Sequence, residues 1–263
     1  MNPLDTIAQH CQQLRLSGLA QTVPHAVALA TQEAWSLETF LSYVLEQEIS
    51  QRQDRRVERL LRQARLPPHK TLDQFDQDRL PLRVRRQMTW LIEGQFIPQA
   101  ENILIFGLPG TGKTHLAAAL AYEWVHRDFP VLFVPTFKLV DTLLRAKRDY
   151  QLEAELKRLD RFAVVVLDDI GYVQQSRDEM EVLFTFLAER YERRSVVITS
   201  NLVFSQWNQI FKDPLTTAAA IDRVVHHSRI IEFGADMGSV RAEQAAQRQL
   251  QLSQPSADPS EPI

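Results

Sequence analysis

The sequence predicts an α/β protein in which a parallel β-sheet is covered by helices and preceded by a region of helices alone. From about residue 101 onward, short runs of β-branched residues alternate with amphipathic stretches of helical period. Strands that alternate with helices favour a parallel sheet. The runs are continuously apolar, which is typical of strands buried on both faces. Before residue 98, helical periodicity and arginine runs are present without a convincing strand.

The long helix expected in the first region begins after Ser36, a suitable N-cap residue. Apolar residues follow at intervals of three and four, and Pro67 and Pro68 end the pattern near Leu66. In the second region we expect helices at about 113–126, 137–159 and 178–193, and strands at 102–106, 131–134, 163–168, 195–200 and 229–233.

These elements divide the chain into a helical domain at 1–98 and an α/β domain at 99–241. Residues 242–263 are rich in Gln, Ser and Pro, a composition that predicts a disordered tail.

The composition excludes several classes of protein. The 263 residues are 44% hydrophobic and 24% charged, which is enough apolar material for a buried core. The net charge of −3 indicates no partner by itself. A single cysteine, Cys11, excludes an internal disulfide and a cysteine-based zinc site. No apolar run reaches the roughly 18 residues of a membrane span and no secretory signal is present, so we expect a cytoplasmic protein without membrane partners.

A phosphate-binding motif follows the first predicted strand. Residues 107–114 read GLPGTGKT, which fits the pattern G-x-x-x-x-G-K-[ST], and an apolar helix begins directly afterwards. In such a loop the glycines let backbone N–H groups surround phosphates, the lysine neutralises their oxygens and the hydroxyl ligates Mg²⁺. The predicted nucleotide-binding residues are Gly107, Leu108, Pro109, Gly110, Thr111, Gly112, Lys113, Thr114 and His115.

Polar residues at the ends of two later strands fit the same site. Asp168 and Asp169 end the third predicted strand, and the carboxyl ends of parallel strands are where ligands bind. Asp168 is placed to hold Mg²⁺ together with Thr114, and Asp169 to orient and polarise the attacking water. Asn201 ends the fourth strand, where it could contact the γ-phosphate or that water, although asparagine is also a common turn residue there.

Arg223 lies in an otherwise apolar helical stretch after the fourth strand. Two interpretations remain open from the residues alone. One is an arginine finger that reaches the nucleotide of a neighbouring subunit, and the other is a surface arginine paired with Asp222.

Several stretches together resemble the IstB-type helper ATPases of bacterial insertion sequences, relatives of the DnaC helicase loaders within the AAA+ class. The similar stretches are ARLPPHKTLDQFD at 64–76, GLPGTGKTHLA at 107–117, LDDIGY at 167–172, ERYERRSVVITSN at 189–201 and AAIDRVVHHS at 219–228. The resemblance implies a five-stranded AAA+ core behind a helical N-terminal domain, with ATP and Mg²⁺ as cofactors. It also implies a homo-oligomer that assembles on duplex DNA and assists a transposase.

By the same resemblance, Asp168 and Asp169 have the metal and water roles, Asn201 acts as a sensor and Arg223 acts across the subunit boundary. Two positions depart from the pattern. Many AAA+ proteins have Glu where Asp169 stands, although the IstB group itself looks similar to this Asp-Asp form, and the closing segment at 238–241 reads GSVR where the family usually has Gly-Glu-Ser-Tyr-Arg. A sensor role for Arg241 therefore stays open.

Three segments rich in basic residues are candidates for DNA contact, and one of them, residues 79–86, holds four arginines and no acid. Residues 50–65 hold six arginines and two acids, and the predicted helices between the second and third strands hold seven basic and five acidic residues. Cations at helical spacing neutralise duplex phosphates regardless of base sequence, whereas most charge runs are solvated helix faces. The segments at 50–65 and 79–86 could instead contact the transposase. The candidates are Arg52, Arg55, Arg56, Arg59, Lys138, Arg145, Lys147 and Arg148.

Two other functions share much of this pattern. A DnaC-like helicase loader would have the same nucleotide residues but contact a replicative helicase and prefer single-stranded DNA. The stretch at 64–76 looks closer to the helper family. A DNA-binding scaffold that does not hydrolyse ATP would have no need to keep Lys113, Thr114, Asp168 and Asp169 together.

Overall fold

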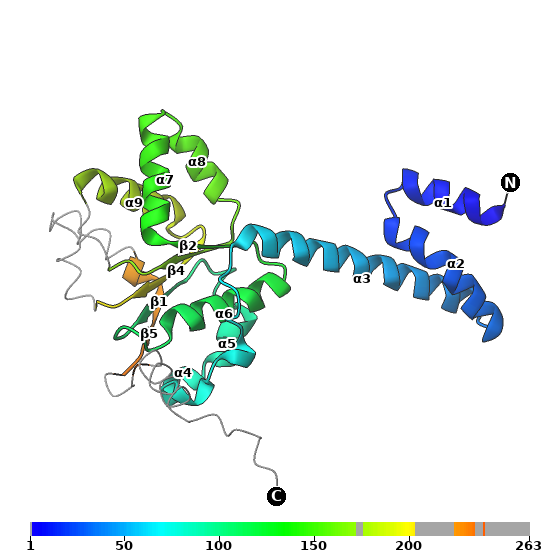
Figure 1. Cartoon of the computed structure of the whole chain (residues 1–263), viewed down its shortest axis with the longest axis horizontal. Coiled ribbons are helices and arrows are strands. Elements are labelled where there is room, and N and C mark those ends of the chain that lie inside the picture. Colours follow the sequence, from blue (N-terminus) through cyan, green and yellow to red (C-terminus); the bar gives the residue numbers. More distant parts are fainter. Residues whose placement is uncertain (1, 172–175, 203–223, 235–238, 240–263) are drawn as a thin grey trace, which may run out of the picture. The chain divides into compact units, whose positions relative to one another are not determined.

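The computed structural model describes residues 2–171, 176–202, 224–234 and 239, and in it the chain divides into two units between Arg62 and Gln63 (Figure 1). This division falls earlier than the boundary near residue 98 that the sequence pattern suggested. The reason is a set of buried contacts with the α/β unit: Phe96 lies edge-on against Trp124, whose indole N–H donates to the Leu91 carbonyl at 2.7 Å. Residues 63–98 therefore pack as part of the α/β unit.

The helical unit is formed by α1 (Pro3–Gln13), α2 (Ser17–Gln32) and most of α3 (Leu37–Ala64). The Ser36 hydroxyl accepts the Thr39 N–H at 3.2 Å, so the predicted N-cap is confirmed. α3 ends just before Arg65, which has a left-handed backbone with a φ of 56°, and the two prolines follow. Val23, Ala26 and Val44 form the small core of this unit.

The α/β unit contains one five-stranded sheet in which every paired strand is parallel, as predicted. Its strands are β1 (Asn102–Phe106), β2 (Val131–Pro135), β3 (Val164–Asp168), β4 (Ser195–Ser200) and β5 (Ser228–Glu232), in the order β2-β3-β4-β1-β5. All residues of β1 and β4 are buried, which explains their continuous apolar pattern.

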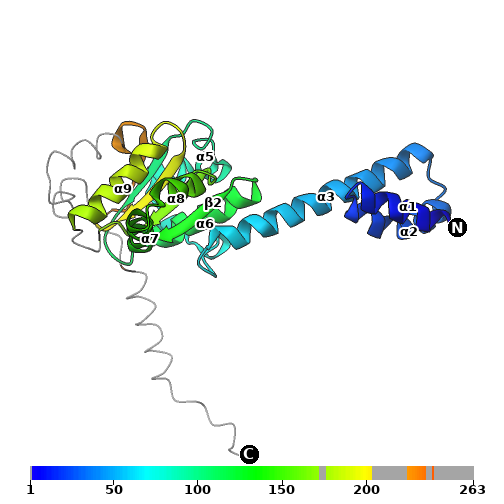
Figure 2. The same ribbon diagram turned by 90° about the horizontal axis from the view of Figure 1, so that it is seen from above.

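Helices cover both faces of this sheet (Figures 1 and 2). On one face α6 (Lys113–His126) packs against β1 to β4. On the other face α7 (Thr136–Arg148), α8 (Leu152–Leu159) and α9 (Arg177–Arg190) bury a core with Leu104, Leu167 and Ile198 from the central strands. The segment before β1 contains the short helices η1 (Leu72–Gln74), η2 (Gln77–Arg79), α4 (Leu82–Arg85) and α5 (Met88–Glu93).

The parallel order brings the carboxyl ends of β1, β3 and β4 to one edge of the sheet. β1 lies between β4 and β5, and the loop that follows it leads into α6. The predicted site residues come from this loop and from the carboxyl ends of β4 and β3, the two strands on one side of β1.

Among the described residues, no helix is long and apolar enough to cross a membrane.

Candidate active site

The loop between Phe106 and Lys113 has a backbone that requires glycine at two positions. Gly110 and Gly112 have φ values of 84° and 102°, a region that side chains rarely adopt. A Cβ atom on Gly110 would also collide with the Ser239 hydroxyl, which lies against the loop. The predicted glycines therefore allow the curved backbone in which N–H groups point toward a phosphate.

Lys113 is held on the inside of this curve. Its side chain is buried, and its ammonium donates to the carbonyl oxygens of Gly107 and Leu108, each at 2.8 Å. The Thr111 hydroxyl donates to the same Leu108 carbonyl at 2.9 Å. The loop thus keeps a cation beside its glycines at the start of α6, where phosphate oxygens would accept the same hydrogen bonds.

Asp168 joins the loop to the end of β3. The Thr114 hydroxyl donates to Asp168 Oδ1 at 2.9 Å, so two residues that are 54 positions apart form one cluster of oxygen atoms. A hydroxyl and a carboxylate are the hard oxygen ligands that Mg²⁺ prefers in phosphate sites. The residues present therefore fit a magnesium ion.

Asp169 adopts a left-handed backbone, with a φ of 61°. Its carboxylate accepts a hydrogen bond from Asn201 Nδ2 at 3.1 Å, so the two predicted polar residues that follow β3 and β4 are in contact. Asp and Asn adopt this backbone region more readily than most other residues with side chains. This preference gives a physical reason for aspartate at this position.

One wall of the site comes from the segment before β1. The Phe75 ring lies edge-on against His115 with centroids 5.3 Å apart, and it also lies next to Gly112. His115 Nε2 donates to the Thr71 carbonyl at 3.1 Å. Burial, together with the positive charge of Lys70, lowers the pKa of His115 despite this bond, so its ring is neutral at pH 7.

Sequence reasoning missed two residues of this site, Phe75 and Thr199. Phe75 lies within the stretch 64–76, whose resemblance assigns no role to the aromatic ring. Thr199 donates to Asp168 Oδ1 at 2.7 Å and lies inside β4, where a threonine is an ordinary strand residue. Only the pairing of β3 with β4 could have revealed its position.

Two candidate residues and the predicted tail at 242–263 lie outside the described part of the chain. Arg223 immediately precedes the described segment 224–234, and Arg241 lies two positions after Ser239. Ser239 itself lies against Gly110 of the phosphate loop.

Two basic candidates of the helical unit, Arg52 and Arg55, have partners within that unit. Arg52 donates to Glu48 Oε1 at 2.6 Å and to the Arg15 carbonyl at 2.9 Å, and Arg55 donates to the Ser17 hydroxyl. Glu48, which is buried, also accepts the Leu19 N–H at 2.7 Å. Arg52 and Arg55 thus stabilise the turn between α1 and α2.

Arg56 and Arg59 are exposed on the same helix. Within the described ranges, the Arg59 side chain forms no hydrogen bond or ion pair. It is therefore better placed than Arg52 to give its charge to a partner.

The basic candidates on α7 are mostly exposed and mostly paired. The contacts are Lys138 with the ring of Phe137, Arg145 with Asp141 at 2.8 Å and Lys147 with Glu181 at 2.9 Å. Arg148 is exposed and has no ion-pair partner among the residues described. Surface pairs of this kind contribute about 0–1 kcal/mol and are readily exchanged for a phosphate.

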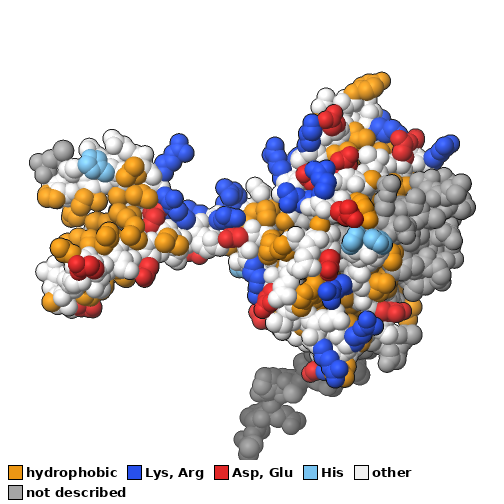
Figure 3. Space-filling model, turned by 180° about the vertical axis from the view of Figure 1, so that it is seen from behind, with side chains coloured by type: hydrophobic (Ala, Val, Ile, Leu, Met, Phe, Trp, Pro, Cys, Tyr) orange, Lys and Arg blue, Asp and Glu red, His pale blue; other side chains and the backbone are white. Residues whose placement is uncertain are grey.

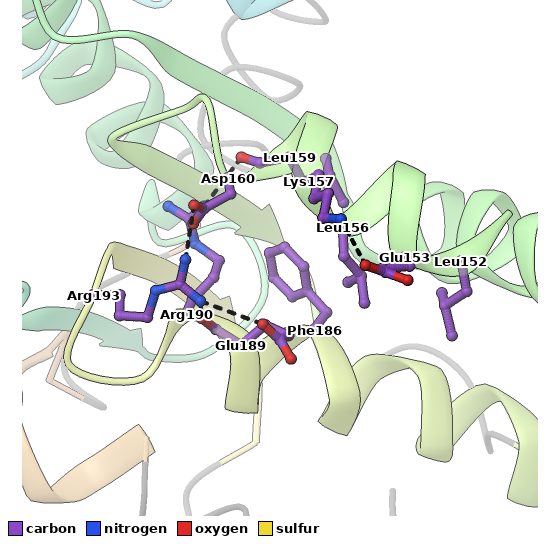
Figure 4. Close-up of a pocket in the computed structure, with 10 residues that line it drawn as sticks. All are labelled: Leu152, Glu153, Leu156, Lys157, Leu159, Asp160, Phe186, Glu189, Arg190 and Arg193. Atoms are coloured by element: carbon purple, nitrogen blue, oxygen red, sulfur yellow. Dashed lines mark hydrogen bonds and ion pairs between the residues drawn. The ribbon is translucent and has the colours of Figure 1, made fainter.

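A cavity of about 540 Å³ lies between α8 and α9, away from the phosphate loop (Figure 4). Beside it, the buried Arg190 donates to the carbonyls of Leu159, Phe162, Ala163 and Ser195 at 2.9–3.2 Å. The carbonyls of Phe162, Ala163 and Ser195 lie at the amino ends of β3 and β4, the opposite edge of the sheet from Asp168, and Leu159 ends α8. Burial lowers the pKa of Arg190 to about 9, so the guanidinium stays charged at neutral pH. Its role is to join the two strand ends.

Solved structures with a similar fold identify the class of the α/β unit. The chain is similar in fold to the DnaC helicase loader, with a TM-score of 0.51 and 18% identity over 64% of this chain and 98% of that one. It is also similar to domain III of the replication initiation protein DnaA from Thermotoga maritima, with a TM-score of 0.54 and 15% identity over 72% and 77% of the two chains. The fold is therefore that of an AAA+ P-loop domain.

The chain belongs to the family of IstB-like ATP binding proteins, whose profile matches residues 9–247. It is 41% identical to an insertion-sequence ATP-binding protein of Sinorhizobium fredii over 89% of this chain and 79% of that protein. It is 35% identical to an ATP-binding protein of the insertion sequence IS21 from Pseudomonas aeruginosa, over 89% and 88% of the two chains. Fold and family together make the protein an ATPase, as the sequence predicted.

Replacing Lys113 by alanine is expected to weaken ATP binding by about tenfold or more, because a charge-assisted hydrogen bond to phosphate contributes at least that factor. Equilibrium titration with a fluorescent ATP analogue measures the effect. Lys157→Ala removes an exposed lysine as the control. Wild-type affinity in Lys113→Ala would show that the loop does not bind the triphosphate.

Replacing Asp169 by asparagine is expected to leave ATP affinity nearly unchanged and to slow hydrolysis by about 10²–10⁴-fold, since an amide cannot accept the proton of water. Asparagine tolerates the left-handed backbone, so the loop keeps its shape. Phosphate release under saturating ATP measures the rate. Hydrolysis at the wild-type rate would restrict Asp169 to a structural role.

Proposed function

We propose that this ATPase assembles on duplex DNA and assists a transposase in selecting and engaging its target. The observation that carries the proposal is the similarity, over nearly nine-tenths of the chain, to ATP-binding proteins of insertion sequences. A helicase-loading function shares the fold but has weaker support, because the likeness to the DnaC loader is at 18% identity and concerns the fold alone.

In this proposal the residues at the carboxyl ends of the strands have separate roles in ATP hydrolysis. Lys113 and the loop N–H groups bind the triphosphate, and Thr114 and Asp168 hold Mg²⁺, which when bound neutralises charge on the β- and γ-phosphates. Asp169 orients water and accepts its proton. Asn201, which donates to the Asp169 carboxylate, holds that side chain in place or contacts the γ-phosphate itself.

DNA contact in this proposal uses exposed cations. Figure 3 shows Lys and Arg side chains interspersed with acidic ones over the face of the α/β unit that is turned to the viewer. Arg59 on α3 and Arg148 on α7 are exposed and without described ion-pair partners. Such cations bind the phosphate backbone without regard to base sequence, which suits a helper that accepts many targets.

The helical unit offers a surface for a protein partner. Apolar side chains gather on it in Figure 3, and α3 exposes Leu37, Leu41, Leu45 and Ile49 at intervals of four residues. Exposed apolar rows of this size are typical of protein interaction sites. We assign this row to the transposase contact.

Two assays distinguish the helper from the loader. In the first, phosphate release is measured with duplex and with single-stranded DNA, and the proposal expects stronger stimulation by duplex. In the second, purified transposase is tested for target capture with and without this protein and ATP. Stimulation confined to single-stranded DNA, together with no effect on target capture, would overturn the proposal in favour of a helicase loader.

We predict that the double variant Arg59→Ala and Arg148→Ala weakens duplex binding equally for all sequences. It should also reduce the slope of log K against log salt concentration by about one for each phosphate that the variant no longer neutralises. Fluorescence anisotropy over a salt series measures the slope. Arg127→Ala, which removes an exposed arginine paired with Glu123, is the matched control. An unchanged slope in the double variant would assign both arginines to solvated surface.

We predict that Arg223 acts on the nucleotide of a neighbouring subunit. Arg223→Ala should bind ATP normally and hydrolyse it about 10³–10⁵-fold more slowly, the range for arginine fingers in other NTPases. Mixing Arg223→Ala subunits with Lys113→Ala subunits should restore part of the DNA-stimulated activity, because some interfaces then combine an intact loop with an intact finger. Mixed oligomers that form on DNA but stay inactive would contradict the assignment.

A further inference from the structure

Thr199 occupies a position that links both acidic residues of the site. It lies in β4, which pairs with β3 in a register that sets Leu167 beside Ile198 and therefore brings Thr199 level with Asp168. Its side chain is 1% exposed. A valine would pack equally well at such a strand position. Packing alone therefore does not explain why this residue has a hydroxyl.

The hydroxyl makes two hydrogen bonds of opposite sense. It donates its one proton to Asp168 Oδ1 at 2.7 Å and accepts the backbone N–H of Asp169 at 2.8 Å. The Thr199 carbonyl also accepts the N–H of Ile170 at 3.0 Å. One residue of β4 thus bonds to the side chain of the first acid and to the backbone around the second.

These bonds determine two features of the site. Thr114 and Thr199 donate to the same oxygen of Asp168, so they define the rotation of its carboxylate, and neither hydroxyl engages Oδ2. The bonds to the Asp169 and Ile170 amides stabilise the left-handed turn at Asp169. The separation between the two carboxylates therefore depends on the Thr199 hydroxyl.

We propose that Thr199 is a positioning residue for ATP hydrolysis, which holds Asp168 in the orientation that binds Mg²⁺ and Asp169 in the conformation that orients water. The inference rests on the metal and water roles given under Proposed function. It differs from a purely structural role, in which the hydroxyl would serve only to satisfy a buried amide.

Thr136 provides a matched control for that structural role. It is 2% exposed, and its hydroxyl donates to the backbone carbonyl of Asp168 at 3.1 Å. Thr136→Val therefore removes a buried threonine hydrogen bond beside the same residue but leaves both carboxylates with their partners. Loss of thermal stability is expected in this variant and in Thr199→Val.

The experiment compares Thr199→Val, Thr199→Ser and Thr136→Val in the full chain. For each variant, phosphate release is measured over a range of MgCl₂ concentrations, and binding of a fluorescent ATP analogue is measured in EDTA. Thr199→Val should lower kcat by about tenfold or more and raise the half-saturating Mg²⁺ concentration by a similar factor, as expected when a hydrogen bond to a charged group is removed. Its metal-free nucleotide affinity should be unchanged, because Lys113 and its loop are untouched.

Thr199→Ser keeps the hydroxyl and should restore most of both values, whereas Thr136→Val should keep the wild-type Mg²⁺ requirement. If Thr199→Val does not fold, Thr199→Cys replaces it, since a thiol has a similar size but is a much weaker donor. Wild-type Mg²⁺ dependence in the valine or cysteine variant, or a serine variant as defective as valine, would overturn the inference.

Asp168→Asn separates failure of this inference from failure of the metal assignment. If Asp168→Asn raises the Mg²⁺ requirement and Thr199→Val does not, the positioning role of Thr199 is wrong and the metal role of Asp168 stands. If neither variant changes the requirement, both assignments are wrong.

Discussion

Asp168 is where three segments that are distant in sequence meet. Hydroxyls from the start of α6 and from β4 both donate to one of its oxygens, and its own backbone carbonyl accepts the Thr136 hydroxyl at the start of α7. A carboxylate beside buried strand ends needs such donors, because a charge without hydrogen bonds is costly there. This residue therefore links the phosphate loop to β3 and β4 through hydrogen bonds.

This constraint also explains the local backbone. The turn after β3 must bring a second carboxylate to the same edge, and it does so with a left-handed residue at Asp169, bonded to β4 through Thr199 and Asn201. Aspartate adopts that conformation more readily than most other residues with side chains. The backbone and the side chain of Asp169 are therefore both held by contacts with Thr199 and Asn201.

The arginines of this protein have different roles, which depend on their burial and their partners. Arg190 is buried and joins the amino ends of two strands, and Arg52 stabilises a turn in the helical unit, so neither is free to give its full charge to a partner. Arg59 and Arg148 are exposed, and the described residues give them no ion pair. Composition cannot separate these roles because all four stand in segments that are equally rich in charge.

The class of fold, the places of all five strands and the residues of the phosphate loop can be read from the amino-acid sequence. This is possible because buried parallel strands are continuous apolar runs and because the loop motif is local, with each residue within a few positions of the next. The folded chain was needed to show that Thr199 and Phe75 belong to the site, that the backbone of Asp169 is left-handed and that residues 63–98 pack with the α/β unit. These features depend on strand register and on contacts between distant segments, and no local pattern records which residue of one strand stands beside which residue of the next.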